Sequence, residues 1–148
     1  MIRVQAEPFD AGAELSRIKA RAGTGACVLF CGTVREMSGD TVLSSMTLEH
    51  YPGMTETALE AIEAEARARW PLLETLIIHR HGTLLPGDDI VLVIASSAHR
   101  QAAFEACHFL IDWLKTKAPF WKREASADTT QWVAAKPQDD AAAQRWKT

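Results

Sequence analysis

The stretch DDIVLVIASSAHRQAAFEACHFLIDWLKTK, residues 88–117, decides the fold. Its first ten residues carry an apolar run that is typical of a strand. The remainder, from Ala98 to about Lys117, is the longest helix that the sequence predicts. The apolar stripe of this helix consists of Phe104, Cys107, Ile111 and Leu114. A strand followed directly by a long amphipathic helix indicates a domain in which helices cover a sheet.

Further strands and helices are predicted on both sides of this stretch. Residues 74–82 predict a strand that reaches the strand at 88–97 through the turn TLLPGD. The other predicted strands are residues 2–7, 26–35 (a buried strand), 41–51 and 130–135, with a loop at 36–40. The other predicted helices run from Asp10 to about Arg21, from Thr55 to Trp70 and, in the tail, after Pro137. This pattern predicts an α+β fold with a mixed, mostly antiparallel sheet packed against helices.

The composition is that of one globular domain. The 148 residues are 47% hydrophobic and 24% charged, and we expect a single domain over residues 1–148, whose tail from about residue 137 is free to be flexible. A formal net charge of -3 argues against a nucleic-acid binder. The N-terminus lacks a secretory pattern, no apolar window has the length of a membrane span, and three cysteines suit a reducing compartment. We therefore expect a cytoplasmic protein that binds neither nucleic acid nor membrane.

Several residues with the chemistry of metal ligands have simpler interpretations. Cys27 and Cys31 face the same side of a predicted strand, but further ligands do not follow at the usual spacing, so we interpret both as buried packing residues. His79 and His81 close a strand without a neighbouring carboxylate, which favours a satisfied or exposed strand end. His108 is interpreted as a residue at the edge of the core. We expect no metal ion and no cofactor.

Two stretches gather cations in a way that indicates an anionic ligand. In SSAHRQAAFEA, residues 96–106, Ser96 or Ser97 can cap a helix whose first turn carries His99 and Arg100. Cations at a helix N-terminus oppose the helix dipole, and their presence indicates a bound anion. The alternative is an exposed first turn that tolerates the mismatch.

The second stretch, LKTKAPFWKRE at residues 114–124, crowds positive charge around a wall of large aromatic residues. Its cations are Lys115, Lys117, Lys122 and Arg123. Pro119 ends the preceding helix, and Phe120 and Trp121 form the wall. An apolar wall can lower the pKa of a lysine, which frees the amine for proton transfer or nucleophilic attack. The alternative is a solvated cationic helix end, which the helix dipole favours.

Taken in order, these stretches resemble the motifs of the large, catalytic subunit of molybdopterin synthase. The motifs are FCGTVR (30–35), MTLEHYPGM (46–54), RWPL (69–72), HRHGTLLPGD (79–88), SSAHRQAAFEA (96–106) and DWLKTKAPFWKRE (112–124). The resemblance implies an α/β-hammerhead fold and a central homodimer. It also implies a small ubiquitin-like partner subunit whose C-terminal Gly-Gly thiocarboxylate donates sulfur to cyclic pyranopterin monophosphate, which forms the dithiolene of molybdopterin.

The same resemblance implies roles for individual residues. It places the family's catalytic lysine on Lys115 and a second pocket lysine on Lys122. The implied substrate-binding residues are Thr33, Val34, Arg35, His99, Arg100, Lys115, Lys122, Arg123 and Glu124. Since a thiocarboxylate and a cyclic phosphate are both anions, fixed cations would offset their repulsion. Lys115 would act either as an acid or base or as a covalent nucleophile.

The length of the predicted long helix bears on how these residues could meet. His99 and Lys115 are roughly 24 Å apart at the rise of an α-helix, about twice the span of a pterin. Two chains around a two-fold axis could bring the start of one helix to the end of the other, so we expect a homodimer with a shared site. Two other functions remain open: a non-catalytic anion-binding or interaction module, and a lysine Schiff-base enzyme acting on a phosphorylated carbonyl compound.

Overall fold

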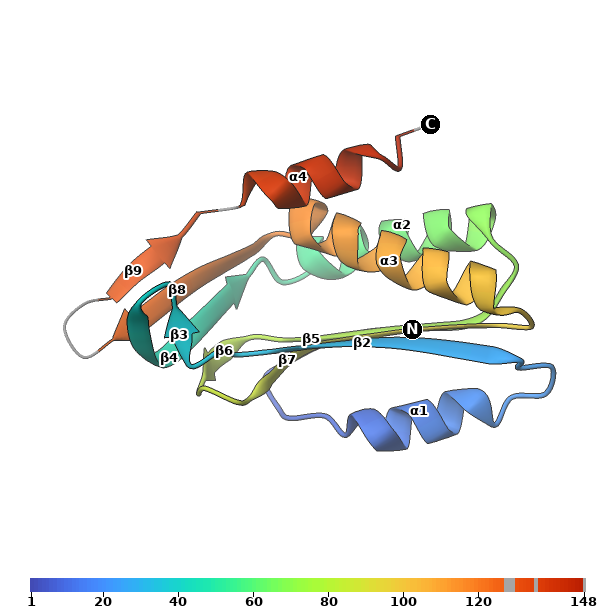
Figure 1. The fold of residues 1–148 in the computed structure, drawn as a ribbon, viewed down its shortest axis with the longest axis horizontal. Coiled ribbons are helices and arrows are strands. Elements are labelled where there is room, and N and C mark those ends of the chain that lie inside the picture. The colour runs from blue at the N-terminus through green and yellow to red at the C-terminus, as the bar shows by residue number, and fades with distance from the viewer. Residues whose placement is uncertain (127–129, 135, 148) are drawn as a thin grey trace.

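The centre of the fold is a four-stranded sheet that separates two layers of helices (Figure 1). A computed structural model describes residues 1–126, 130–134 and 136–147. The strand order of this sheet is β1 (Ile2–Gln5), β5 (Leu72–Arg80), β7 (Asp89–Ser97) and β2 (Ala26–Thr33). β1 runs parallel to β5, and the other pairs are antiparallel. α1 (Ala11–Lys19) lies on one face, and α2 (Met54–Arg69) and α3 (Arg100–Lys117) lie on the other.

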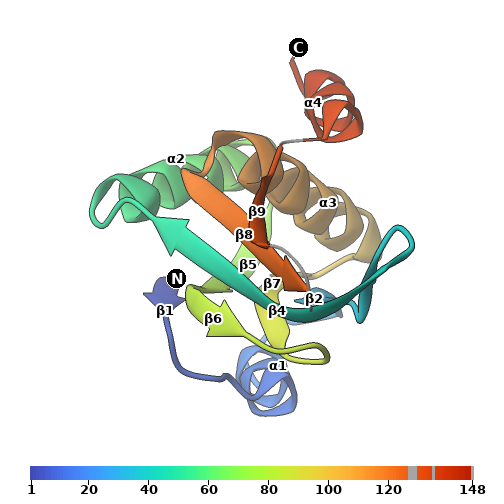
Figure 2. The same ribbon diagram turned by 90° about the vertical axis from the view of Figure 1, so that its left-hand side faces the viewer.

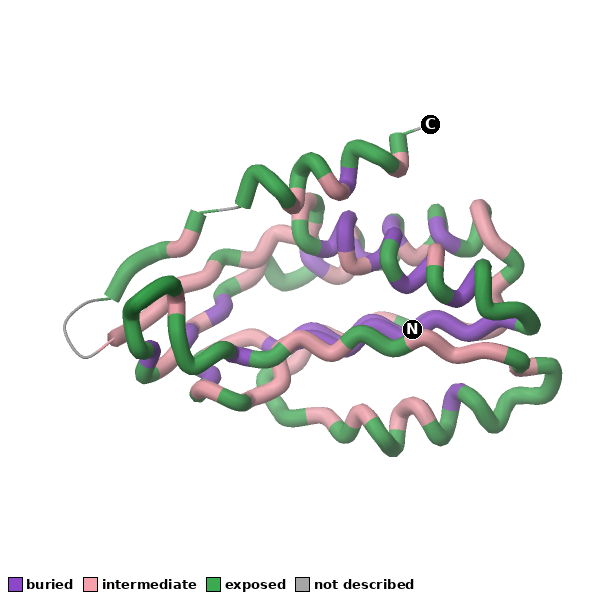
Figure 3. The backbone as a smooth tube through the Cα atoms, viewed as in Figure 1, coloured by how far each residue is buried: buried purple, intermediate pink, exposed green. Residues whose placement is uncertain are grey.

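The apolar runs of β5 and β7 are continuous because both faces of these strands are buried, as Figure 3 shows. Side chains alternate across a strand, so neighbouring residues enter different cores. The core on the side of α1 contains Ile18, Leu76, Ile78, Leu92 and Ile94. The core under α2 and α3 includes Ile77, Val91, Val93, Phe109 and Leu110. Within the described part of the chain, no helix is long and apolar enough to cross a membrane.

A second sheet closes one end of the first (Figure 2). It consists of β3 (Met37–Ser38), β4 (Thr41–His50), β8 (Phe120–Ser126) and β9 (Thr130–Val133), with β6 (Gly82–Leu84) paired to β4. β4 and β8 are antiparallel, and Leu48 is the register partner of Lys122. A third core of Val34, Met46, Leu48 and Leu84 lies on the face of this sheet that carries Leu48.

The C-terminal segment ends in α4 (Pro137–Gln144), which packs along α3. Asp112, a buried carboxylate of α3, accepts hydrogen bonds from Arg145 Nη2 and Trp146 Nε1, each at 2.7 Å. The Trp146 ring lies 5.6 Å from Phe109 and 5.7 Å from Trp70, measured between ring centroids. Polar and aromatic contacts together therefore hold the tail against α3.

The α+β class is confirmed, but the structure adds strands that the sequence analysis did not predict. β8 carries three charged residues in succession, Lys122 to Glu124, and has no apolar alternation that would indicate a strand. Its backbone is ordered by pairing with β4 and β9, which are contacts that a local pattern does not contain. The predicted loop at 36–40 includes β3, and the predicted turn at 83–88 begins within β6. The predicted strand at 130–135 is shorter, and its position 135 lies outside the described residues.

Predicted burial is wrong on α3 and on β2. Phe104 is 60% exposed, because Ala103, Ala106 and Leu110 form the face of α3 that meets the sheet. Cys107 and Leu114 are buried as predicted. Leu29 and Phe30 are each 37% exposed, because β2 is an edge strand of its sheet and not a fully buried one. His108 lies at the edge of the core as predicted: its side chain is 54% exposed, and its ring lies 6.1 Å from that of Trp146, which packs against the core.

The predicted serine cap of α3 is also wrong. His99 occupies the N-cap position, and no side chain caps the helix there. Ser97 Oγ donates to the carbonyl of Pro71 at 2.9 Å, and Ser96 Oγ accepts from the backbone N–H of Glu74 at 3.0 Å. Both hydroxyls therefore tie β7 to the start of β5.

Candidate functional site

The two lysines of the predicted site come from consecutive elements. Lys115 lies exposed in the last turn of α3, and Pro119 separates this helix from β8. Lys122 is half-buried on β8 and shares a strand face with Phe120. Burial lowers the pKa of Lys122, and the ammonium groups of Lys115 and Lys136 lower it further. The charge of Lys115 therefore acts on Lys122.

A buried histidine forms the floor beneath Phe120. The rings of His79 and Phe120 are stacked, with centroids 3.7 Å apart and 16° between their planes. His79 Nδ1 lies 2.8 Å from the carbonyl of Arg80, so this nitrogen carries the hydrogen and donates it. Burial lowers the pKa of His79 to about 3; the Arg80 carbonyl opposes this, and Lys122, Lys115 and His50 add to it. The floor is therefore aromatic, polar and uncharged at neutral pH.

Two further histidines border this floor. The ring of His50 lies 6.1 Å from Phe120 and 4.5 Å from His81. Thr55 Oγ1 donates to the carbonyl of Tyr51 at 2.8 Å, and it lies 3.3 Å from His50 Nδ1. Burial lowers the pKa of His50, and the neighbouring His81 lowers it further. Among the described residues, no group of three or more His, Cys, Asp or Glu side chains is arranged to hold a metal ion.

The two faces of β8 divide the predicted site residues. Glu124 shares the face of Lys122 and accepts a hydrogen bond from Ser38 Oγ at 2.9 Å. Arg123 lies on the opposite face, where its guanidinium group sits 5.5 Å from the centroid of the Trp132 ring. Within one chain, Arg123 and Lys122 therefore point away from each other.

The other predicted site residues fall into two groups. Val34 is buried in the core that also contains Leu48, the register partner of Lys122, while Thr33 and Arg35 on either side of it are exposed. These three residues therefore lie near the sheet that carries Lys122. His99 and Arg100 are exposed at the start of α3, at the far end of this helix from β8 (Figure 1). One chain does not bring them to the lysines.

The burial of His79 was not predicted from the sequence, although the pattern contained a signal. In a strand over residues 74–82, His79 shares a face with Ile77, which indicates burial and not an exposed strand end. The predicted wall of Phe120 and Trp121 does not form as one surface: Phe120 shares the face of Lys122, whereas Trp121 is exposed on the opposite face of β8. The ring that stacks on Phe120 comes from β5 and could not be read from the stretch itself.

Burial of a neutral His79 should make the free energy of unfolding depend on pH. The unfolded chain binds a proton below the ordinary pKa of 6.5, whereas the folded chain resists protonation down to about 3. The contribution of His79 to the free energy of unfolding is thus complete above pH 6.5. Between pH 6.5 and about 3 it falls by about 1.4 kcal/mol for each pH unit. In urea unfolding, the free energy of unfolding of His79→Phe should fall less steeply than that of wild type as the pH is lowered from neutral to mildly acidic. Exposed His108→Phe is the control, and equal slopes for His79→Phe and wild type would contradict this account.

Two lysines beside a buried, neutral pair of stacked rings form a cationic arrangement that is suited to holding anionic reactants. The chain belongs to the MoaE protein family, whose model matches residues 4–117. Its relatives include the molybdopterin synthase catalytic subunit of Pseudomonas aeruginosa, which is 54% identical over 147 residues and covers 99% of this chain and 98% of the relative.

Solved structures share the fold. The molybdopterin biosynthesis MoaE protein from Burkholderia ambifaria superposes with a TM-score of 0.84 at 49% identity, over 100% of this chain and 98% of that chain. A protein–protein complex of subunits 1 and 2 of molybdopterin-converting factor from Helicobacter pylori contains a chain with a TM-score of 0.77 at 20% identity, over 91% of both chains.

Proposed function

We propose that this chain is the catalytic subunit of a molybdopterin synthase. It transfers sulfur from the C-terminal thiocarboxylate of a small ubiquitin-like subunit to cyclic pyranopterin monophosphate, and so forms the dithiolene of molybdopterin in molybdenum cofactor biosynthesis. The observation that carries the proposal is the pair Lys115 and Lys122, which lies in the stretch that resembles the family's motif (residues 112–124) and is set beside the uncharged ring pair of His79 and Phe120. The enzyme acts in the cytoplasm, in agreement with its three free cysteines.

The proposed roles follow from the charge of the reactants. Both substrates are anions, and Lys115 and Lys122 offset their repulsion where the reacting groups meet. A thiocarboxylate that gives up its sulfur must end as a carboxylate, so water supplies an oxygen atom and protons must move. Lys122 suits proton transfer because its lowered pKa brings it closer to neutrality. Lys115 serves as acid, base or covalent nucleophile, and Glu124 orders the lysine face through Ser38.

The remaining substrate-binding residues are assigned by position and charge. Arg35 offers a guanidinium fork that can bond two phosphate oxygens at once, beside Thr33 and Val34 at the end of β2. Arg123 faces the other side of β8, where it can meet an acidic surface of the small subunit. His99 and Arg100 act on the neighbouring protomer's site, because they lie at the opposite end of α3 from Lys115.

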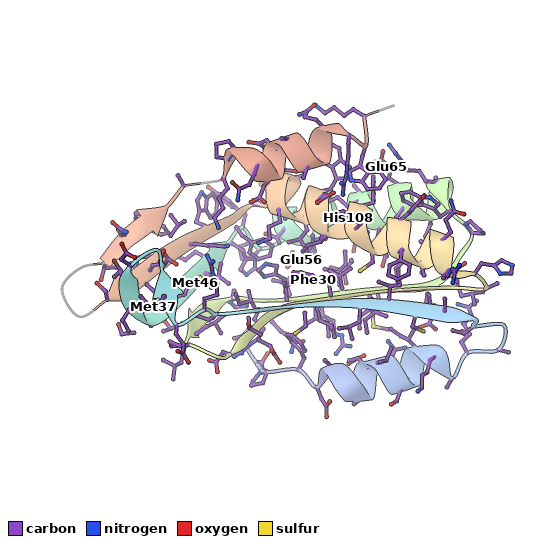
Figure 4. All side chains as sticks on the ribbon, in the orientation of Figure 1. Phe30, Met37, Met46, Glu56, Glu65 and His108 are labelled. Atoms are coloured by element: carbon purple, nitrogen blue, oxygen red, sulfur yellow. The ribbon has the colours of Figure 1, made fainter. Side chains whose placement is uncertain are left out.

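A homodimer is part of the proposal, and the surface beside α3 supports it. An apolar groove runs between β2 and α3, and Phe30 and His108 border it on opposite sides (Figure 4). Leu29, Phe30 and Phe104 are exposed there. Exposed apolar residues grouped in this way are typical of an interface, and a second copy would cover them.

Reconstitution tests the function. The purified chain, mixed with thiocarboxylated small subunit and cyclic pyranopterin monophosphate, should form molybdopterin without any further protein. Deleting the partner's terminal Gly-Gly should abolish product and weaken binding, and added salt should weaken binding of the intact partner because cations meet a carboxylate. A mixture without product would contradict the function, whereas unchanged affinity after the deletion would contradict insertion of the tail. Borohydride trapping of a sugar phosphate would instead favour a Schiff-base enzyme.

A further inference from the structure

The stacked pair of His79 and Phe120 joins the two sheets at the place where β8 begins. His79 belongs to β5 of the first sheet, and Phe120 is the first residue of β8 in the second. His50 of β4 is the register partner of Phe120. The ring of His79, from the first sheet, therefore meets the second sheet at the end of the β4–β8 pair where β8 begins. The direction of β8 is thereby fixed at its first residue.

Lys122 follows Phe120 by two residues and therefore shares its face of β8. Its register partners are Leu48, which is 1% exposed, and Val133. The side chain of Lys122 therefore extends from β8 between two apolar neighbours on the adjacent strands. The first residue of β8, Phe120, is fixed by its stacking on His79. Such surroundings exclude water from one side of the lysine stem.

We propose that His79 is a positioning residue for Lys122: its ring, stacked on Phe120, fixes the start of β8 and keeps Lys122 against a floor that excludes water. The inference rests on the proposed role of Lys122 in sulfur transfer. His79 itself does not exchange a proton with substrate. It works by shape and by remaining uncharged, since a positive imidazole next to two lysines would add to their mutual repulsion.

The electrostatics of the site agree with this arrangement. Burial is the largest cause that lowers the pKa of Lys122. Its charged neighbours come from several elements: Lys115 from α3, Lys136 and Asp139 from the tail and α4, and Glu124 from β8 itself. The lysines lower the pKa of Lys122 and the two carboxylates raise it. Removing the stack would admit water while leaving all four charged neighbours in place, so the pKa of Lys122 would move toward its ordinary value of 10.5.

The test measures the reactivity of Lys122 in the intact protein without substrate. Acetic anhydride is applied over a series of pH values, and mass spectrometry follows acetylation of the peptide that contains Lys122. The pH midpoint of labelling reports the protonation of Lys122. A change in the access of the reagent to this lysine would alter only the rate reached at high pH. The variants are His79→Ala, Phe120→Leu and His79→Phe. The matched control is His81→Ala, which removes an equal ring two residues further along, just after the end of β5, at a position whose ring faces His50 and not Phe120.

We expect His79→Ala and Phe120→Leu to move the midpoint of Lys122 labelling to higher pH by about half a unit or more. His79→Phe keeps a flat ring on Phe120 and should keep the wild-type midpoint, as should the control. Circular dichroism confirms folding, and if His79→Ala does not fold, Phe120→Leu and His79→Phe still decide. A wild-type midpoint in Phe120→Leu, or an equal shift in His79→Phe and His79→Ala, would overturn the proposal.

A second measurement separates this inference from the function on which it rests. In the reconstituted synthase, one limb of the pH profile of kcat should report Lys122. The variants that shift the labelling midpoint should shift this limb, and those that keep the midpoint should keep it. Labelling that shifts while the kcat profile stays fixed would support the positioning role and contradict the catalytic role of Lys122. Labelling that does not shift overturns the positioning role whatever the activity.

Discussion

Lys115→Ala should reduce product formation by about a thousandfold while the fold remains intact, because the change removes a group that acts on the reacting atoms. Lys115 is exposed at the end of α3, and its side chain fills no part of the core. The free energy of unfolding should therefore stay within about 0.5 kcal/mol of wild type. A single-turnover product assay and a thermal melt on the same preparation measure the two quantities.

Lys117→Ala is the matched control for this experiment. Lys117 has the same charge and lies on the same helix end, but its ammonium group sits 4.6 Å from the centroid of the Trp113 ring. Its loss should cost about 0.5 kcal/mol of stability and leave activity within a few-fold of wild type. The two variants should thus differ widely in activity while their free energies of unfolding stay similar. Activity of Lys115→Ala close to that of the control would rule out a catalytic role.

Mixed dimers of Arg100→Ala and Lys115→Ala should recover about a quarter of wild-type activity, although each parent homodimer is nearly inactive. In a shared-site dimer, a heterodimer has one site that carries both lesions and one site that carries neither. Random mixing makes half of the dimers heterodimers, so one site in four is whole. Subunit exchange after mild denaturation prepares the mixture, and native mass spectrometry verifies the exchange.

The alternative arrangement gives a different result. If one chain supplied every residue of its own site, each site in the mixture would carry one lesion, and activity would not return. Verified exchange without recovery would therefore contradict the shared site. His99 and Arg100 would then serve only a local role at the start of α3.

The parts of the fold that the sequence predicts are those specified by local patterns. The apolar run of β7 and the helical periodicity of α3 are both complete within residues 88–117, and both elements form close to the predicted limits. β8 could not be predicted in this way, because its charged residues are ordered by strands that are distant in sequence. The same cause hides the two faces of β8, on which Lys122 and Arg123 point in opposite directions.

The candidate site was predictable only in its charged residues. Lys115 and Lys122 stand out because cations rarely gather beside large aromatic residues without a reason. His79 does not stand out, because a histidine near the end of an apolar strand is compatible with either an exposed or a buried ring. Its partner Phe120 is distant in sequence, and only the packing of β5 against β8 brings the two rings together.

The pairing of β4 with β8 also sets the order in which the protein can assemble in time. Ser44 and Ala125, which are bonded across this pair, are 81 residues apart. The antiparallel pair β5 and β7 is local by comparison, and it can form as soon as residue 97 has left the ribosome. One edge of β4 must wait until residues 120–126 have been synthesised, so Lys122 reaches its place among the last parts of the fold. A nascent or truncated chain can therefore bury most of its first sheet and still lack the proposed site.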